Sequence, residues 1–129
     1  MKVLKAEQVA DLAHELPGAG AELDVHWLEG PANADRLDVG LVTVVPGGAT
    51  PPHVHLGGQV IVVISGEGFV ATGDERVALG AGDVVITPPG ELHTHGAAAG
   101  SHLAHLTVTT AGYEFPAVVT DPPAGTGDA

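Results

Sequence analysis

The stretch that decides the fold is PGGATPPHVHLGGQVIVVISGEG, residues 46–68. It places His53 and His55 one residue apart, ahead of Gly-Gly-Gln and an unbroken apolar run. In an extended strand, residues i and i+2 point to the same face, so both imidazoles can reach one metal ion. Gln59 follows a flexible glycine pair that can bend its side chain toward the same point. The alternatives are a polar turn before a strand and, for Gln59, a side chain that hydrogen-bonds the backbone.

Around this stretch the sequence is typical of short β-strands separated by turns. Residues 59–65 form the strongest predicted strand, and residues 67–79 are expected to form a hairpin that turns at Gly73-Asp74. Other strands are expected at 21–30, 36–45, 83–89 and 102–110, and a short turn or helix at 4–16. About seven or eight short strands predict an all-β fold, an antiparallel sandwich or barrel.

Composition limits the possible partners and compartments. The 129 residues are 44% hydrophobic but only 3% aromatic, which predicts one domain with a core of Val, Leu, Ile and Ala. A net charge of -12 repels phosphate backbones and anionic membranes, so we expect neither nucleic-acid nor membrane partners. The absence of cysteine excludes disulfides and fits a cytoplasmic protein. We expect an N-terminal arm (1–20), the β domain (21–118) and a flexible C-terminal tail (119–129).

A second histidine segment lies further along the chain. The sequence GDVVITPPGELHTH, residues 82–95, places His93 after a Pro-Pro-Gly turn, at the start of a later strand. A strand that pairs across the barrel can bring His93 beside His53, His55 and Gln59 as a fourth ligand. Imidazole and amide oxygen are compatible with Mn, Fe, Co, Ni and Zn, so the residues do not choose the ion.

Together the two segments resemble the two sequence motifs of the cupin superfamily. The positions that fall on the first motif are Gly47, His53, His55, Gln59 and Gly66. The positions that fall on the second are Gly82, Pro88, Gly90 and His93. The chain departs from the pattern twice, with Gln59 in place of a glutamate and Ala97 in place of an asparagine. The resemblance runs from about Val42 to Thr110 and implies a single-domain cupin jelly roll that binds one divalent metal.

Within this superfamily the chain looks closest to small members with HxHxxGQ and PPGxxHxHGA, which here read HVHLGGQ and PPGELHTHGA. That subset includes manganese-dependent hydroxynitrile lyases and domains similar to those fused to carboxymuconolactone decarboxylases. Small polyketide cyclases share the fold. A neutral Gln59 in place of glutamate leaves the full charge of a divalent ion unneutralised, which favours Lewis-acid chemistry of the lyase, isomerase or cyclase type.

Three further residues are candidates for proton transfer or substrate binding. His105 can be a general acid or base if its strand face points inward, and the hydroxynitrile-lyase-like subset also carries a histidine there. His95 has the parity of His93, so it either lines the same cavity or is held by backbone at the rim. Thr50 resembles a pocket threonine of the subset and either binds a substrate hydroxyl or is a simple turn residue.

The sequence therefore predicts a metal-dependent cupin enzyme that acts on a small, mostly neutral organic substrate. No Lys or Arg falls in either motif, so a clamp for a carboxylate or phosphate is not evident. The alternatives are a metal-dependent dioxygenase and a non-enzymatic metal- or ligand-binding cupin. A homodimer is expected by analogy with small cupins. Ile64 and Phe69 are expected in the core.

Overall fold

The computed structural model describes residues 1–12, 22–30, 37–110 and 113–114. The predicted boundary at residues 20–21, the end of the predicted helix and the predicted tail at 119–129 lie outside these residues. Within them the chain forms one helix and nine strands, which confirms the all-β prediction. The elements are α1 (Ala6–Ala10), β1 (Leu23–Glu29), β2 (Asp38–Val44), β3 (Val54–His55), β4 (Gln59–Ala71), β5 (Arg76–Gly80), β6 (Val84–Thr87), β7 (Thr94–Ala97), β8 (Leu103–Thr109) and β9 (Tyr113–Glu114).

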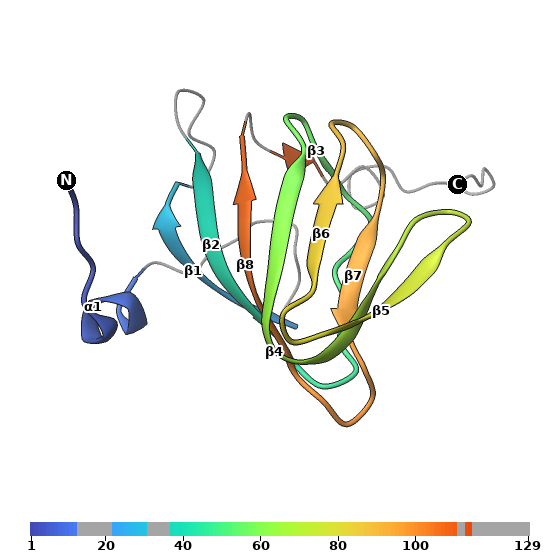
Figure 1. Cartoon of the computed structure of the whole chain (residues 1–129), viewed down its shortest axis with the longest axis horizontal. Helices are drawn as coiled ribbons and strands as arrows, with labels where there is room; N and C mark the ends of the chain where they lie inside the picture. Colours follow the sequence, from blue (N-terminus) through green and yellow to red (C-terminus); the bar gives the residue numbers. More distant parts are fainter. Residues whose placement is uncertain (13–21, 31–36, 111–112, 115–129) are drawn as a thin grey trace.

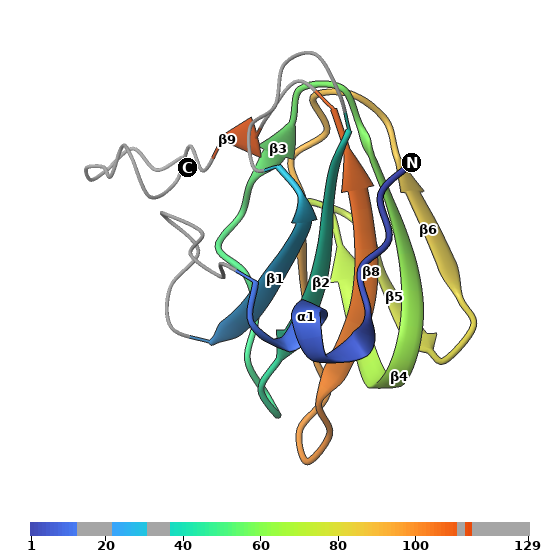
Figure 2. The same ribbon diagram turned by 90° about the vertical axis from the view of Figure 1, so that its left-hand side faces the viewer.

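The strands form a jelly roll in which every pairing is antiparallel. The order β1-β2-β8-β4 makes up the first sheet, and β6 pairs with the free edge of the first half of β4 (Figure 1). The second half of β4 pairs with β5 and β7. Strands β3 and β9 pair at one end of the molecule (Figure 2). No helix among the described residues is long and apolar enough to cross a membrane.

Strand β4 connects the two parts of the roll. The sequence predicts a strand that ends at residue 65, but β4 is 13 residues long and extends to Ala71. The register of β4 against β8 shifts between Val63 and Ser65, and Gly66 has a φ of +87°, which non-glycine side chains rarely adopt. Thus the glycines bend the strand rather than end it. The predicted hairpin is confirmed, with the Thr72 N–H donating to the Glu75 carbonyl at 2.9 Å.

The core lies between the two halves of the roll and follows strict alternation. In β2 and in β8, every second residue is buried. The buried apolar residues are Val25, Trp27, Val42, Val44, Ile61, Val63, Leu79, Ala97 and Leu103. The prediction that Ile64 belongs to the core is wrong: its side chain is 52% exposed, because Ile61 and Val63 take the inward positions of β4. Phe69 is partly buried and lies under the Arg76 guanidinium, 3.7 Å from ring centroid to Cζ.

Candidate metal centre

The backbone places His53 and His93 side by side. The two residues lie opposite each other in an antiparallel bridge. The His53 N–H donates to the His93 carbonyl at 2.9 Å, and the His93 N–H donates to the His53 carbonyl at 3.0 Å. Residues directly opposite in an antiparallel pair project to the same face. The bridge therefore brings a ring from each motif to one point, with ring centroids 4.4 Å apart.

Both rings are held by the same local contact. His53 Nδ1 lies 2.8 Å from the Pro51 carbonyl, and His93 Nδ1 lies 2.9 Å from the Glu91 carbonyl. A carbonyl only accepts, so each Nδ1 carries the proton and donates it. In a neutral imidazole the lone pair is then on Nε2. Orientation through the other ring nitrogen is the usual arrangement of histidines that bind metals.

His55 completes a group of three imidazoles. It lies in β3, two residues from His53, and its ring centroid is 4.9 Å from that of His53 and 5.3 Å from that of His93. One nitrogen from each ring can be chosen so that the three lie within 4.8 Å of one another. Both nitrogens of His55 are buried and have no hydrogen-bond partner among the described residues. A buried polar group without a partner is costly, and a metal ion would supply that partner.

Gln59 brings an amide oxygen to the same group. Its Nε2 donates to the Thr107 hydroxyl at 2.5 Å, which turns Oε1 toward His93. Oε1 lies 3.1 Å from His93 Nε2. Because His93 Nδ1 donates to the Glu91 carbonyl, we infer that a neutral ring turns its Nε2 lone pair toward this oxygen. Two ligands about 2.1 Å from one ion and at right angles are about 3.0 Å apart. The contact therefore fits two neighbouring ligands of a cation, and the four residues form a candidate centre for a divalent metal.

Burial keeps these imidazoles in the form that binds metal. It lowers the pKa of His53 to about 4 and the pKa of His55 to about 3, and in His55 the charges of His53 and His93 add to the effect. Burial also lowers the pKa of His93. A metal ligand must be deprotonated, so lowered pKa values remove the proton competition near neutral pH.

These pKa values make the stability of the metal-free protein depend on pH. Between about pH 4 and pH 6.5 the unfolded chain binds protons that the folded chain excludes at His53 and His55, so stability rises with pH. The contribution is complete above about pH 6.5 and is lost as pH falls through that window. We expect the urea midpoint of the metal-free protein to change little from pH 7.5 to about pH 6.5 and then to fall steadily to pH 5. A midpoint that is constant over this range would contradict the buried neutral state.

His95 and His105 form a second pair behind the three imidazoles. Both are buried, and their rings meet edge to face with centroids 5.1 Å apart. The centroid of the His95 ring lies 5.2 Å from that of His53, so the pair adjoins the candidate metal centre. None of the four ring nitrogens has a hydrogen-bond partner among the described residues. Burial lowers the pKa of His95 well below its usual value, and the charge of the neighbouring His105 is the second cause of this shift. Burial also lowers the pKa of His105 to about 4.

The structure decides which face of β8 points inward. Leu103, His105 and Thr107 are buried, and the alternate residues are partly exposed. His95 points into the same interior rather than lying at a solvated rim, since it is 4% exposed. The rings predicted to move protons are therefore close to the rings predicted to bind metal. Their catalytic roles stay predictions.

Thr50 is engaged in holding β7 in place. Its hydroxyl accepts a hydrogen bond from the His95 backbone N–H at 3.1 Å and lies 3.1 Å from the Thr94 hydroxyl oxygen. The Thr94 hydroxyl in turn donates to the Thr50 carbonyl at 2.6 Å. These contacts assign Thr50 a positioning task beside His95. Its predicted contact with a substrate hydroxyl stays a prediction.

Sequence reasoning missed two threonines that support the centre. The Thr107 hydroxyl accepts a hydrogen bond that orients the Gln59 amide, and the Thr94 hydroxyl donates a hydrogen bond to the Thr50 carbonyl. The parity of β8 placed Thr107 on the same face as His105, which was the available signal. Its pairing with Gln59 depends on the register between β8 and β4, where Gln59 lies opposite Thr109. No local pattern gives that register.

The fold and the four donor side chains define a jelly-roll protein with a candidate metal site. Residues 40–109 match the Cupin_2 family, described as a cupin domain. This match covers more than half of the chain, and the chain therefore belongs to the cupin family. The identification of both cupin motifs from sequence is confirmed at this level.

Curated relatives include enzymes of different classes. The chain is 40% identical over 92 residues to an (R)-mandelonitrile lyase from Granulicella tundricola, with 64% of this chain and 70% of the lyase covered. It is 33% identical over 72 residues to a gentisate 1,2-dioxygenase from a Ralstonia species, with 55% of this chain covered. The match spans only 20% of the dioxygenase. These relatives catalyse different reactions, so membership of the cupin family does not by itself give the reaction of this chain.

Among solved structures, the chain resembles the polyketide cyclase RemF from Streptomyces resistomycificus. The TM-score is 0.71 and the identity 28%, and the match covers 88% of this chain and 81% of the cyclase. The proteins that this chain is similar to thus include a lyase, a dioxygenase and a cyclase, and the particular chemistry has to be argued from the site.

Proposed function

We propose that this protein is a metal-dependent enzyme in which His53, His55, Gln59 and His93 bind one divalent ion, and that it acts as a lyase, isomerase or cyclase on a small organic substrate. The observation that carries the proposal is the lone-pair contact between His93 Nε2 and Gln59 Oε1, at 3.1 Å, next to the unpaired nitrogens of His55. The lyase relative, 40% identical, supports a hydroxynitrile-lyase-like version.

The chemistry of the ion depends on its ligands. When bound, a divalent ion here supplies positive charge that polarises a carbonyl, hydroxyl or nitrile group, and its identity among Mn, Fe, Zn, Ni and Co is open. The three histidines are neutral and Gln59 is an amide, so the chain adds no negative charge to the centre. The Thr107 hydroxyl holds the amide in this orientation.

Proton transfer is assigned to the neighbouring pair. His105 is fully buried and has both nitrogens available, so it can take a proton from a substrate hydroxyl and return it to a leaving group. Its lowered pKa, about 4, keeps the ring neutral and able to accept that proton near neutral pH. His95 lies between His105 and His53 and is the second candidate. Thr50 holds the His95 backbone in position.

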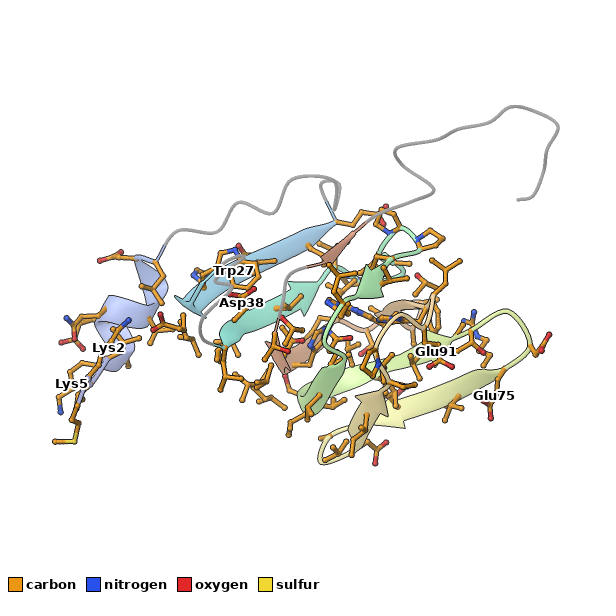
Figure 3. The ribbon with its side chains drawn as sticks, turned by 90° about the horizontal axis from the view of Figure 1, so that it is seen from above. Lys2, Lys5, Trp27, Asp38, Glu75 and Glu91 are labelled. Atoms are coloured by element: carbon orange, nitrogen blue, oxygen red, sulfur yellow. The ribbon has the colours of Figure 1, made fainter. Side chains whose placement is uncertain are left out.

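The distribution of basic side chains favours a neutral substrate. Among the described residues, Lys2 forms an ion pair with Glu29 at 3.2 Å, and Arg76 stacks on Phe69. Lys2 and Lys5 lie on the arm, at the opposite side of the molecule from Glu91, which neighbours the metal centre (Figure 3). The described part of the centre thus offers no cationic clamp for a carboxylate or phosphate. A substrate held by the ion and by neutral hydrogen bonds fits this environment.

The experiment that tests the proposal is an assay of metal-loaded protein under anaerobic conditions with (R)-mandelonitrile, followed by benzaldehyde absorbance. Turnover without oxygen supports the lyase version. The second candidate is a dioxygenase, favoured by the gentisate 1,2-dioxygenase relative. It predicts oxygen uptake with gentisate and no anaerobic turnover. A protein that binds metal but turns over no substrate in a panel of cyanohydrins, enols and phenols would support a non-enzymatic cupin.

Replacing Gln59 with glutamate tests the effect of charge at the centre. The added carboxylate is expected to tighten metal binding at least about tenfold, because it neutralises part of the ion's charge. For the same reason the ion polarises its substrate less, and kcat is expected to fall about 10- to 100-fold. Metal titration and steady-state kinetics check both effects. Weaker metal binding in Gln59→Glu would argue against Gln59 as a ligand.

A further inference from the structure

A row of polar side chains crosses the inner face of the first sheet beside the metal centre. Gln59 lies opposite Thr87 on β6 and opposite Thr109 on β8. Thr109 in turn lies opposite Asp38 on β2. All four side chains are buried, and we call these four residues the polar row. A proposed metal ligand therefore lies between two threonine hydroxyls.

The hydroxyls of Thr87 and Thr109 are open to a ligand. Neither side chain makes a hydrogen bond to any residue in the described ranges, although Thr87 is only 5% exposed and Thr109 only 6%. The hydroxyl of Thr107 differs, because it accepts the hydrogen bond from the Gln59 amide. A buried hydroxyl without a partner is costly, so this pair favours a bound polar group beside the metal centre.

The polar row lies at the end of the roll that a small molecule can reach. Gln59 and Thr109 each keep a little exposed surface, and so does His55. At the other end of β2 and β8, Val44 and Leu103 are completely buried. A substrate that approaches the centre from the open end therefore passes the two free hydroxyls.

An aromatic side chain borders the polar row. Trp27 lies opposite Gly40, and its ring packs over this glycine, 3.5 Å from the place that a Cβ would occupy. The Thr107 methyl group lies 3.4 Å from the same place. Figure 3 shows Trp27 beside Asp38, on the neighbouring strands β1 and β2. The surroundings of the centre thus combine neutral hydroxyls with a flat apolar surface, and the carboxylate of Asp38 disfavours an anionic ligand.

The spacing across the strands fits two oxygen atoms of one ligand. Side chains directly opposite each other in a sheet have Cβ atoms about 5 Å apart, which is the separation expected between Gln59 and each threonine. An oxygen bound to the ion would lie next to the Gln59 amide oxygen. A second oxygen on the adjacent carbon atom, followed by a hydrogen bond of about 2.8 Å, reaches from there to a threonine hydroxyl.

We propose that Thr87 and Thr109 bind a second oxygen of the substrate. The substrate is then a neutral compound with oxygen functions on adjacent carbon atoms, an α-hydroxy ketone or a vicinal diol, joined to an apolar or aromatic group. This proposal rests on the proposed function, because the first oxygen binds the ion held by Gln59 and the three histidines. The two threonines select the substrate and are not metal ligands.

The test compares 2-hydroxyacetophenone with acetophenone, which lacks the hydroxyl, as ligands of the full chain loaded with Mn²⁺. The bound ion broadens the proton resonances of a nearby ligand, so a titration followed by nuclear magnetic resonance gives both dissociation constants without turnover. We expect the wild-type protein to bind 2-hydroxyacetophenone at least about tenfold more tightly. Thr87→Val and Thr109→Val are each expected to lower this ratio at least about threefold, and the double variant to bring it near one.

The matched control is Thr43→Val, which makes the same change on the outer side of β2 and is expected to keep the wild-type ratio. Valine is close to threonine in shape and is favoured in strands, so the variants are expected to fold, which circular dichroism and metal content check. A ratio near one in wild-type protein that contains Mn²⁺, or a ratio that survives in the double variant, would overturn this proposal and leave the metal centre standing. A wild-type protein that binds no Mn²⁺ or other divalent ion would overturn the proposed function and this proposal with it.

Discussion

Replacing His55 with alanine is expected to raise the dissociation constant for Mn²⁺ or Zn²⁺ at least about 100-fold, because changes to mere supporting partners of ligands already cost 10- to 100-fold. Among the three clustered imidazoles, His55 is the ring whose two nitrogens are both buried without a hydrogen-bond partner in the described part of the chain, so its proposed function in the fold is ligation alone. The measurement is metal content by elemental analysis, together with isothermal titration of the metal-free protein.

The thermal midpoint distinguishes loss of a ligand from loss of the fold. Saturating metal is expected to raise the midpoint of the wild-type protein by on the order of 10 °C, since binding at 100 times Kd contributes about 2.7 kcal/mol. In His55→Ala this rise disappears, while the metal-free midpoint changes little. The matched control is His102→Ala, which removes an exposed histidine near Ser65 and is expected to keep the metal-dependent rise. A full rise in His55→Ala would exclude His55 as a ligand.

Replacing His105 with glutamine is expected to lower kcat by about 10²- to 10⁴-fold, the usual contribution of a positioned general acid or base. The side chain is fully buried on β8 and lies beside His95 rather than among the three clustered imidazoles. Metal affinity is therefore expected to stay near that of the wild-type protein. Steady-state kinetics on the substrate found by the anaerobic assay, with metal content measured on the same sample, check both expectations.

The pH profile distinguishes proton transfer from a structural effect. If His105 moves the proton, His105→Gln loses the limb of the kcat profile that reports its ionisation, and a simple packing defect would leave the profile unchanged. His26→Gln, on the outer side of β1, serves as the histidine control and is expected to retain wild-type kcat. A His105→Gln protein with wild-type kcat would remove His105 from the mechanism and direct attention to His95.

The fold class and the candidate ligands can be predicted from the sequence because the patterns that indicate them are local. The HVH spacing sets the parity of His53 and His55, and the Pro-Pro-Gly turn sets the start of the segment that carries His93. The alternation of Leu103, His105 and Thr107 shows that they share one face of a strand. Each of these features depends on a few neighbouring residues and needs no knowledge of strand order.

Features that depend on distant partners could not be predicted. In β4 both faces are apolar, so alternation alone could not tell that Ile61 faces the core and Ile64 faces outward. The second sheet decides it, and that sheet is assembled from segments far along the chain. Gly66 reads as the end of a strand, yet pairing with Leu103 carries β4 through the bend. The Gln59–Thr107 contact likewise depends on the register of β8.

The central claim is that four side chains from two motifs bind one ion, and anomalous diffraction from crystals of Mn²⁺-loaded protein tests it most directly. The account predicts one strong anomalous peak within about 2.3 Å of His53 Nε2, His93 Nε2, Gln59 Oε1 and one ring nitrogen of His55. A peak elsewhere, or one ligated by the histidines with the Gln59 oxygen turned away, would contradict it.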